Sequence, residues 1–225
     1  MTSSPSALQR ALPVLVLVTG ALCIAAASRL LPPALVFLFK PLTTLLVIAW
    51  CWPRGRTVPA MRRWILVGLV FSLGGDVALM WPQAGFLPGL VSFLIAHLAY
   101  IAAFSRPLRF GARPWVFVLY GVVAVAILSQ LWSDVPGGLR APVIGYVVCL
   151  ACMAAQAAAW WRSAPGSRQA LFAAVGGALF MVSDSLLAIN KFATPLPASA
   201  LWVLSTYWVA QLCIAASLPA DRRPR

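Results

Sequence analysis

The sequence contains no glutamate, and only four aspartates, two lysines and one histidine occur among its 225 residues. Charged residues make up 9% of the chain and hydrophobic residues 62%, which is far outside the range of a soluble domain. We therefore expect an integral membrane protein. The chain also lacks a linker or low-complexity segment long enough to separate two domains, so residues 1–225 are expected to form one membrane domain.

Several kinds of site are missing as well. A single histidine and five dispersed cysteines do not make a zinc site, although Cys149 and Cys152 have C-x-x-C spacing, and we expect neither a metal nor a structural disulfide. Phosphate-binding loops, dinucleotide fingerprints and a G-x-S-x-G serine motif are absent, so no cofactor is expected. The net charge of +13 does not indicate nucleic-acid binding, because the basic residues stand between apolar runs.

Eight apolar runs are long enough to cross a bilayer as helices, which takes about 17–25 residues each. Short segments rich in proline and glycine separate them, and nine of the ten tryptophans stand near a run's end, as at a membrane interface. The predicted fold is an all-α bundle of eight transmembrane helices over residues 11–27, 34–52, 64–81, 86–104, 114–132, 141–161, 169–190 and 197–218.

The arginines predict the orientation of this bundle. If the N-terminus is cytoplasmic, thirteen basic residues fall in cytoplasmic segments and only Arg29, Arg140 and Lys191 fall in outer ones. We expect both termini to be cytoplasmic and the protein to span a cell membrane many times, as in a bacterial inner membrane. Alternatively, Arg10, the first apolar run and Ala25–Ala27 form a cleaved signal peptide, which would leave seven helices.

Four ionisable residues lie inside the predicted spans, where each costs about 2.5–3.5 kcal/mol on insertion scales. They are Lys40, Asp76, His97 and Asp184. At about 1.5 Å per residue, these four side chains and Tyr207 reach one slab between the middle and the outer half of the membrane. The polar side chains could simply hold helices together through hydrogen bonds, but two buried carboxylates are an expensive way to do so.

Two carboxyl groups in a low-dielectric site do not both ionise readily, so one residue type can supply both an acid and a base. This arrangement suits acid-labile bonds that break through an oxocarbenium-like transition state. The spans thus predict acid/base chemistry by Asp76 and Asp184.

Five motifs in order resemble the YhhN-like lysoplasmalogenase family. They are KPL (40–42), SLGGDVALM (72–80), F-x-x-G-L-x-x-F-x-x-A-H-x-x-Y (86–100), SDSLLAINKF (183–192) and T-Y-x-x-A-Q (206–211). The resemblance implies an eight-helix membrane hydrolase that cleaves the vinyl ether bond of lysoplasmalogens to a fatty aldehyde and a glycerophospho-alcohol. It places Asp76 and Asp184 at the family's presumed catalytic positions, and its partners would be a lyso-ether phospholipid and membrane lipids.

The remaining motif residues are expected to bind substrate or support the aspartates. Lys191 would hold the lipid phosphate, and Lys40 would favour the ionised form of one aspartate. Water or the glycerol hydroxyl would be positioned by His97, Tyr207 and Gln211. The full supporting set is Lys40, Ser72, His97, Tyr100, Ser183, Asn190, Lys191, Tyr207 and Gln211.

A different class of function uses the same aspartates. In a small proton-coupled transporter or lipid flippase, Asp76 and Asp184 would be proton-coupling sites facing a polar cavity. The helices interrupted by glycine or proline that often mark transporter sites are missing from the predicted spans. A purely structural membrane subunit would leave both acids unexplained.

Overall fold

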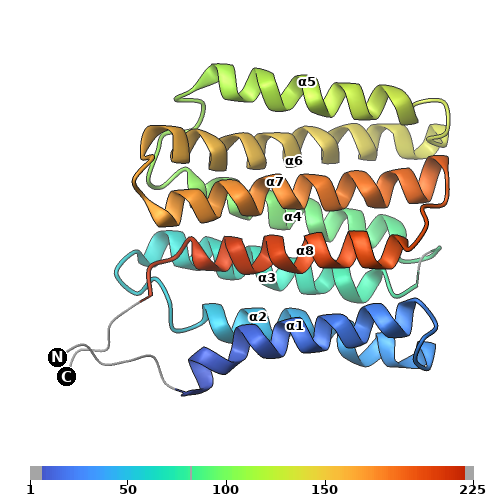
Figure 1. The fold of residues 1–225 in the computed structure, drawn as a ribbon. Helices are drawn as coiled ribbons and strands as arrows, with labels where there is room; N and C mark the ends of the chain where they lie inside the picture. The colour runs from blue at the N-terminus through green and yellow to red at the C-terminus, as the bar shows by residue number, and fades with distance from the viewer. Residues whose placement is uncertain (1–6, 82, 221–225) are drawn as a thin grey trace.

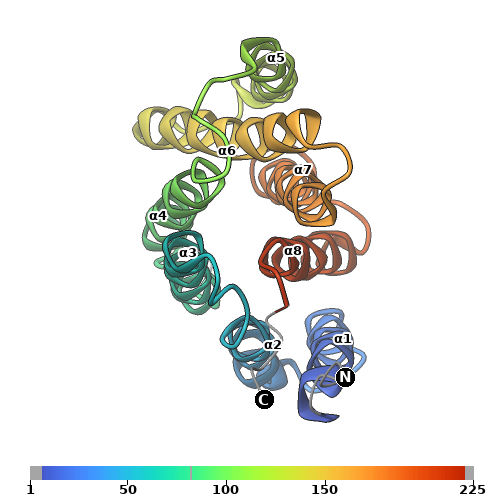
Figure 2. The same cartoon turned by 90° about the vertical axis from the view of Figure 1, so that its left-hand side faces the viewer.

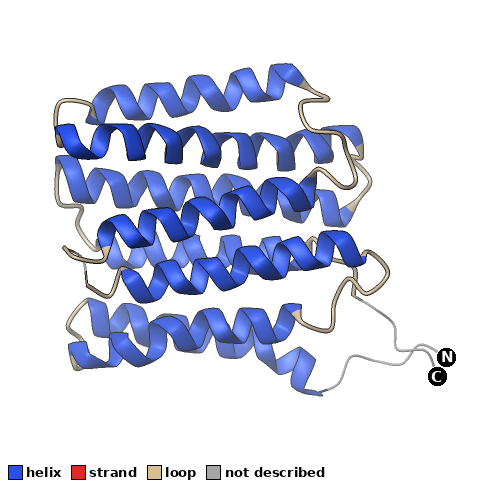
Figure 3. Cartoon of the chain, turned by 180° about the vertical axis from the view of Figure 1, so that it is seen from behind, coloured by secondary structure: helices blue, strands red, loops and turns tan. Residues whose placement is uncertain are grey.

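A computed structural model describes residues 7–81 and 83–220, which fold into eight α-helices without a strand (Figures 1 and 3). Three arginines that contribute to the predicted charge bias lie outside these residues, at positions 222, 223 and 225. Asp221 also lies outside them. The helices are α1 (Ala7–Ala27), α2 (Val36–Cys51), α3 (Pro59–Ala78), α4 (Phe86–Phe104), α5 (Pro114–Leu131), α6 (Gly137–Ser163), α7 (Arg168–Ala188) and α8 (Ser199–Ala216). A short 3₁₀ turn, η1 (Pro33–Leu35), precedes α2, and a π-helix, η2 (Ile189–Ala193), continues α7.

Local sequence signals mark several helix ends. Pro59 and Pro114 open α3 and α5, where the missing amide hydrogen of proline costs nothing. Ser167 caps α7 by accepting a hydrogen bond from the amide of Ala170. The loop before α3 turns at Gly55, whose φ of +70° is unfavourable for any residue with a β-carbon.

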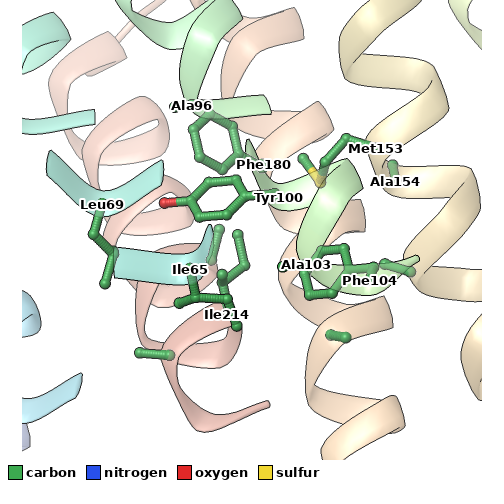
Figure 4. Packing of buried hydrophobic residues seen from close by; sticks show 14 of the residues in the cluster. Ile65, Leu69, Ala96, Tyr100, Ala103, Phe104, Met153, Ala154, Phe180 and Ile214 are labelled. Atoms are coloured by element: carbon green, nitrogen blue, oxygen red, sulfur yellow. The ribbon is translucent and has the colours of Figure 1, made fainter. Parts of the chain in front are cut away.

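The eight helices run side by side, and viewed from the end they form two rows (Figure 2). One row contains α4, α3 and α2, the other contains α7, α8 and α1, α6 lies across one end of both rows, and α5 packs outside α6. Between the rows lies a buried core that includes Tyr100, Phe180, Ile65 and Ile214 (Figure 4). The bundle thus brings segments from both halves of the chain onto one core.

Successive helices run in opposite directions, so the start of α1 and the end of α8 lie at the same end of the bundle (Figure 1). This end, called here the terminal end, also carries the α2–α3 loop, since the amide of Gly55 donates to the carbonyl of Pro219 at 2.9 Å. The opposite end carries η2 and is called the η2 end.

All eight predicted segments correspond to helices, and seven of these helices are long and apolar enough to cross a membrane. The exception is α3, which carries Arg62, Arg63 and Asp76. The described residues form a multi-pass membrane protein with 34 exposed large hydrophobic side chains, as expected for helices that face lipid.

Several predicted boundaries were wrong by a few residues. Helix α3 covers Pro59–Ala78 rather than 64–81, because Pro59 sets its start and the chain turns after Ala78. Helix α6 is longer than predicted, at Gly137–Ser163, and α7 ends at Ala188, where the helix widens into η2. The change in α3 matters most, because it puts Asp76 only two residues before the end of its helix.

Candidate active site

A pocket of about 440 Å³ lies toward the η2 end of the bundle, among α2, α3, α4, α7 and α8. Asp76 and Asp184 both line it, and so do both lysines of the chain, Lys40 and Lys191. Seven of the residues singled out from sequence therefore line one space, since Ser183, Asn190 and Tyr207 are also in its lining. Its other lining residues are Leu79, Phe86, Phe93, Ser183, Leu187, Asn190, Ser199, Ala200, Val203, Leu204 and Tyr207.

Asp76 is almost fully buried and receives two hydrogen bonds on the same carboxylate oxygen, Oδ2. The hydroxyl of Thr44 on α2 donates to it at 2.6 Å, and the hydroxyl of Tyr207 on α8 donates at 2.8 Å. Lys40 lines the same pocket as this carboxylate. Thr44 is fixed in turn by the indole of Trp208, which donates to its hydroxyl at 3.3 Å. These donors stabilise a carboxylate at this position.

A chain of buried hydrogen bonds extends from Tyr207 toward the terminal end. The amide of Gln211 donates to the Tyr207 hydroxyl at 3.1 Å, and its carbonyl oxygen accepts from the Tyr100 hydroxyl at 2.8 Å. The hydroxyls of Tyr100 and Ser72 lie 3.3 Å apart. Ser72, Tyr100 and Gln211 thus lie behind Tyr207 and outside the lining of the pocket. From there they hold in place the Tyr207 hydroxyl that contacts Asp76.

Asp184 has a separate environment. It is half-buried near the end of α7, and the hydroxyl of Tyr146 on α6 donates a short hydrogen bond to its Oδ2. Asp76 and Asp184 therefore share a pocket, but each has its own hydroxyl donors.

The single histidine lies deeper in the core than predicted. His97 is fully buried, its ring centroid is 5.2 Å from that of Tyr146 and 4.7 Å from that of Phe180, and neither ring nitrogen has a hydrogen-bond partner among the described residues. It is not in the lining of the pocket. His97 reaches the site through the rings of Tyr146 and Phe180, and the ring of Phe180 in turn packs against that of Tyr207.

Three further predicted residues have structural contacts at the η2 end. The hydroxyl of Ser183 donates to the carbonyl of Val203 at 3.0 Å and so joins α7 to α8. The side-chain oxygen of Asn190 accepts from the amide of Leu196 at 2.9 Å, which fixes the loop before α8. The ammonium of exposed Lys191 lies 4.8 Å from the ring centroid of Phe86.

Sequence reasoning missed Thr44, Tyr146 and Trp208. Thr44 lies four residues after Lys40 and therefore on the same face of α2, a spacing that could have revealed it. Tyr146 carries no such signal, because α6 contains no other residue predicted for the site.

The height of the site also differs from the prediction. Asp76 lies 17 residues after Pro59, or about 25 Å along α3, whereas the prediction placed it between the middle and the outer half of the membrane. Tyr207 lies lower on α8, but helical side chains lean toward the N-terminal end of their helix, which here is the η2 end. The pocket consequently lies nearer the η2 end of the bundle than its middle.

The described residues contain no group of three histidine, cysteine or acidic side chains arranged to hold a metal ion. The ionisable side chains that line the pocket are the two aspartates, Tyr207 and the two lysines.

Comparison with known proteins gives matches over most of the chain. The YhhN family model matches residues 35–218. The lysoplasmalogenase TMEM86A of Bos taurus is 35% identical over 178 residues, which cover 75% of this chain and 70% of that protein. TMEM86A of Homo sapiens, also a lysoplasmalogenase, is 37% identical over 71% of this chain and 67% of its own length.

A bacterial relative is the lysoplasmalogenase of Mycobacterium tuberculosis, which is 31% identical over 69% of this chain and 60% of its own length. No solved structure matches significantly. The resemblance seen in the five motifs is confirmed, and the enzymes that share it come from vertebrates and bacteria. The chain belongs to the YhhN family.

Proposed function

We propose that this protein is a lysoplasmalogenase, a membrane hydrolase that cleaves the vinyl ether bond of lysoplasmenylcholine or lysoplasmenylethanolamine. The relatives described above bear this name. The observation that carries the proposal is that Asp76 and Asp184 open onto one pocket together with Lys40 and Lys191.

The reaction suits such a pocket. A carboxylic acid protonates the vinyl carbon that does not carry the ether oxygen. The π electron pair forms the new C–H bond, and the other vinyl carbon becomes part of an oxocarbenium ion. Water bonds to the cationic carbon and loses a proton to the second carboxylate. As the hemiacetal collapses, its hydroxyl proton returns to the first aspartate, and the glycerol oxygen leaves with the proton held by the second. A fatty aldehyde is released and both carboxyl groups regain their starting forms.

Each aspartate has a distinct role in this scheme. One is the acid, and the other is ionised, stabilises the cation and accepts the proton of water. The unequal surroundings of Asp76 and Asp184 favour such a division, since Lys40, Thr44 and Tyr207 all act on Asp76. Lys191 would bind the phosphate at the η2 end of the pocket.

Purified protein in detergent tests the substrate class. We expect fatty aldehyde from lysoplasmenylcholine and no product from lysophosphatidylcholine, whose ester of the same chain length needs a nucleophile instead of carbon protonation. Fatty acid from the ester, without aldehyde from the vinyl ether, would contradict the proposal. No feature of the described residues favours the transporter alternative, which predicts proton-dependent uptake into vesicles without either product.

A further inference from the structure

A second, smaller pocket adjoins the first. It has a volume of about 80 Å³ and lies among α4, α5, α6 and α7. Its walls are apolar apart from Tyr146, Asp184 and Ser185. This space, called here the apolar pocket, contains neither lysine in its lining.

Five residues line both pockets: Leu79, Phe86, Phe93, Asp184 and Leu187. Asp184 is the ionisable one among them. Apolar side chains thus surround one side of Asp184, whereas Lys40, Lys191 and Asn190 lie in the pocket on its other side.

The direction of the apolar pocket matches that of a lipid chain. On α5 it extends from Leu131, at the η2 end, to Ala124, seven residues or about 10 Å deeper into the bundle. The neighbouring faces of α5 are exposed, including Val118, Val122 and Val125. A chain entering from Asp184 would therefore point toward the middle of the membrane, while a head group at Lys191 would remain near its face.

We propose that the lysolipid binds across Asp184, with the part of its alkenyl chain next to the vinyl ether in the apolar pocket and its glycerophosphate head group in the pocket of the two lysines. The inference rests on the proposed function for the identity of the lipid. It follows that the vinyl carbons lie beside Asp184 and the glycerol side lies toward Asp76. The reverse orientation would bury a phosphate among apolar walls without a cation, which is strongly unfavourable.

Ala124 is predicted to determine which chain lengths are accepted, because it lies at the deep end of the apolar pocket and has the smallest side chain there. The substitutions Ala124→Leu and Ala124→Phe would fill that end in two steps. Val125→Phe is the matched control, since Val125 is the next residue on α5 and is 67% exposed.

The test compares kcat/KM for lysoplasmenylcholines with sixteen-carbon and six-carbon alkenyl chains. Each buried methylene contributes roughly fourfold in binding, so displacing two or more lowers the long-chain value by about tenfold or more. We expect this loss in Ala124→Phe, a smaller loss in Ala124→Leu, and changes within about twofold for the short chain and for Val125→Phe. If the Ala124 variants and Val125→Phe change kcat/KM by the same factor for each chain length, the inference is overturned.

A binding measurement separates this inference from the proposed function. Saturated ether lysophosphatidylcholines have no vinyl bond to protonate, so their Kd reports the site without catalysis. A long-chain Kd raised by Ala124→Phe but unchanged by Val125→Phe supports the site, even if the wild-type protein releases no aldehyde. A Kd that is the same in both variants contradicts it, whatever the activity.

Discussion

At the scale of single residues, the central feature is the pair of hydroxyl donors on Asp76. Thr44 and Tyr207 reach the same oxygen from α2 and α8, and each is itself held by another side chain, Trp208 or Gln211. The carboxylate is therefore fixed in position by groups with no freedom to rotate away. Such fixed donors keep an ionised group in place during a reaction without further reorganisation.

Thr44→Val removes one of these donors and keeps the shape of the side chain. It leaves Asp76 and the indole of Trp208 each with one partner fewer, which costs about 1–3 kcal/mol of stability. We expect a lower melting temperature together with an aldehyde-release rate reduced by about tenfold or more. Thermal unfolding and the release assay on the same preparation measure both effects.

Thr43→Val is the matched control for this substitution. Thr43 is the adjacent residue, is also fully buried, and bonds to the carbonyl of Phe39 and the hydroxyl of Thr19 instead of to the site. Its loss is expected to cost about 0.5–1.5 kcal/mol of stability and to leave activity near that of the wild type. If both variants lose activity equally, Thr44 has no special relation to Asp76.

The sequence predicted that Asp76, Asp184, Lys40 and Tyr207 reach one region, because ionisable groups are rare inside membrane helices, and all four line one pocket. It did not identify Tyr146, since nothing in the pattern of residues 137–163 relates that tyrosine to Asp184. Nor did it separate His97 from the pocket lining, because depth along a helix does not reveal which way a side chain points.

At the scale of helices, α3 and α4 approach closely because α3 presents glycines to aromatic rings. A β-carbon on Gly68 would lie 2.2 Å from Cε1 of Tyr100, and one on Gly75 would lie 2.4 Å from Cε2 of Phe93. Small residues at such contacts allow membrane helices to pack backbone to backbone. The packing also sets the position of Tyr100, which holds Gln211 and, through it, Tyr207.

Gly68→Ala is therefore expected to displace the Tyr100 ring and to reduce both stability and activity. Overpacking of this kind typically costs about 1–3 kcal/mol. The same substitution at Gly121 on α5, where a β-carbon would meet no atom within 4 Å, should be neutral or stabilise the helix by up to about 1 kcal/mol. A melting temperature for Gly68→Ala equal to that of Gly121→Ala would show that the close approach is not required.

The number and order of the helices were predictable from apolar runs, whereas the residues at which the helices begin and end were less predictable. Pro59 lies in a polar segment, and a count of apolar residues begins only at Trp64, so the first turn of α3 was missed. The π-helix at Ile189–Ala193 has no signature in the pattern of hydrophobic residues. It nevertheless lies directly after the helix that carries Asp184, and π-helical turns are frequent at functional sites.

At the scale of the whole molecule, the basic residues are concentrated at one end of the bundle. The loops at the terminal end carry Arg54, Arg56, Arg106, Arg109 and Arg113, whereas those at the η2 end carry few basic residues. By the positive-inside rule we propose that the terminal end faces the cytoplasm and that all eight helices cross the membrane. The pocket would then lie near the face of the membrane opposite the cytoplasm.

Cysteine labelling tests this orientation. In a variant without the five native cysteines, Ser133→Cys introduces a thiol in the exposed α5–α6 loop at the η2 end, and Gly166→Cys introduces one in the exposed α6–α7 loop at the terminal end. A membrane-impermeant maleimide should label the first in intact bacteria and the second only after permeabilisation. The opposite pattern would invert the proposed topology.

The most direct test of the central claim is aldehyde release from lysoplasmenylcholine by the wild type, Asp76→Asn and Asp184→Asn, with the fold of each confirmed by its melting transition. An amide neither donates nor accepts the proton as a carboxyl group does, and general acid and base groups contribute about 10²–10⁴-fold to a rate. We predict release by the wild type and a loss of at least about 100-fold in each folded variant. A folded Asp76→Asn or Asp184→Asn protein that releases aldehyde at the wild-type rate would contradict the account.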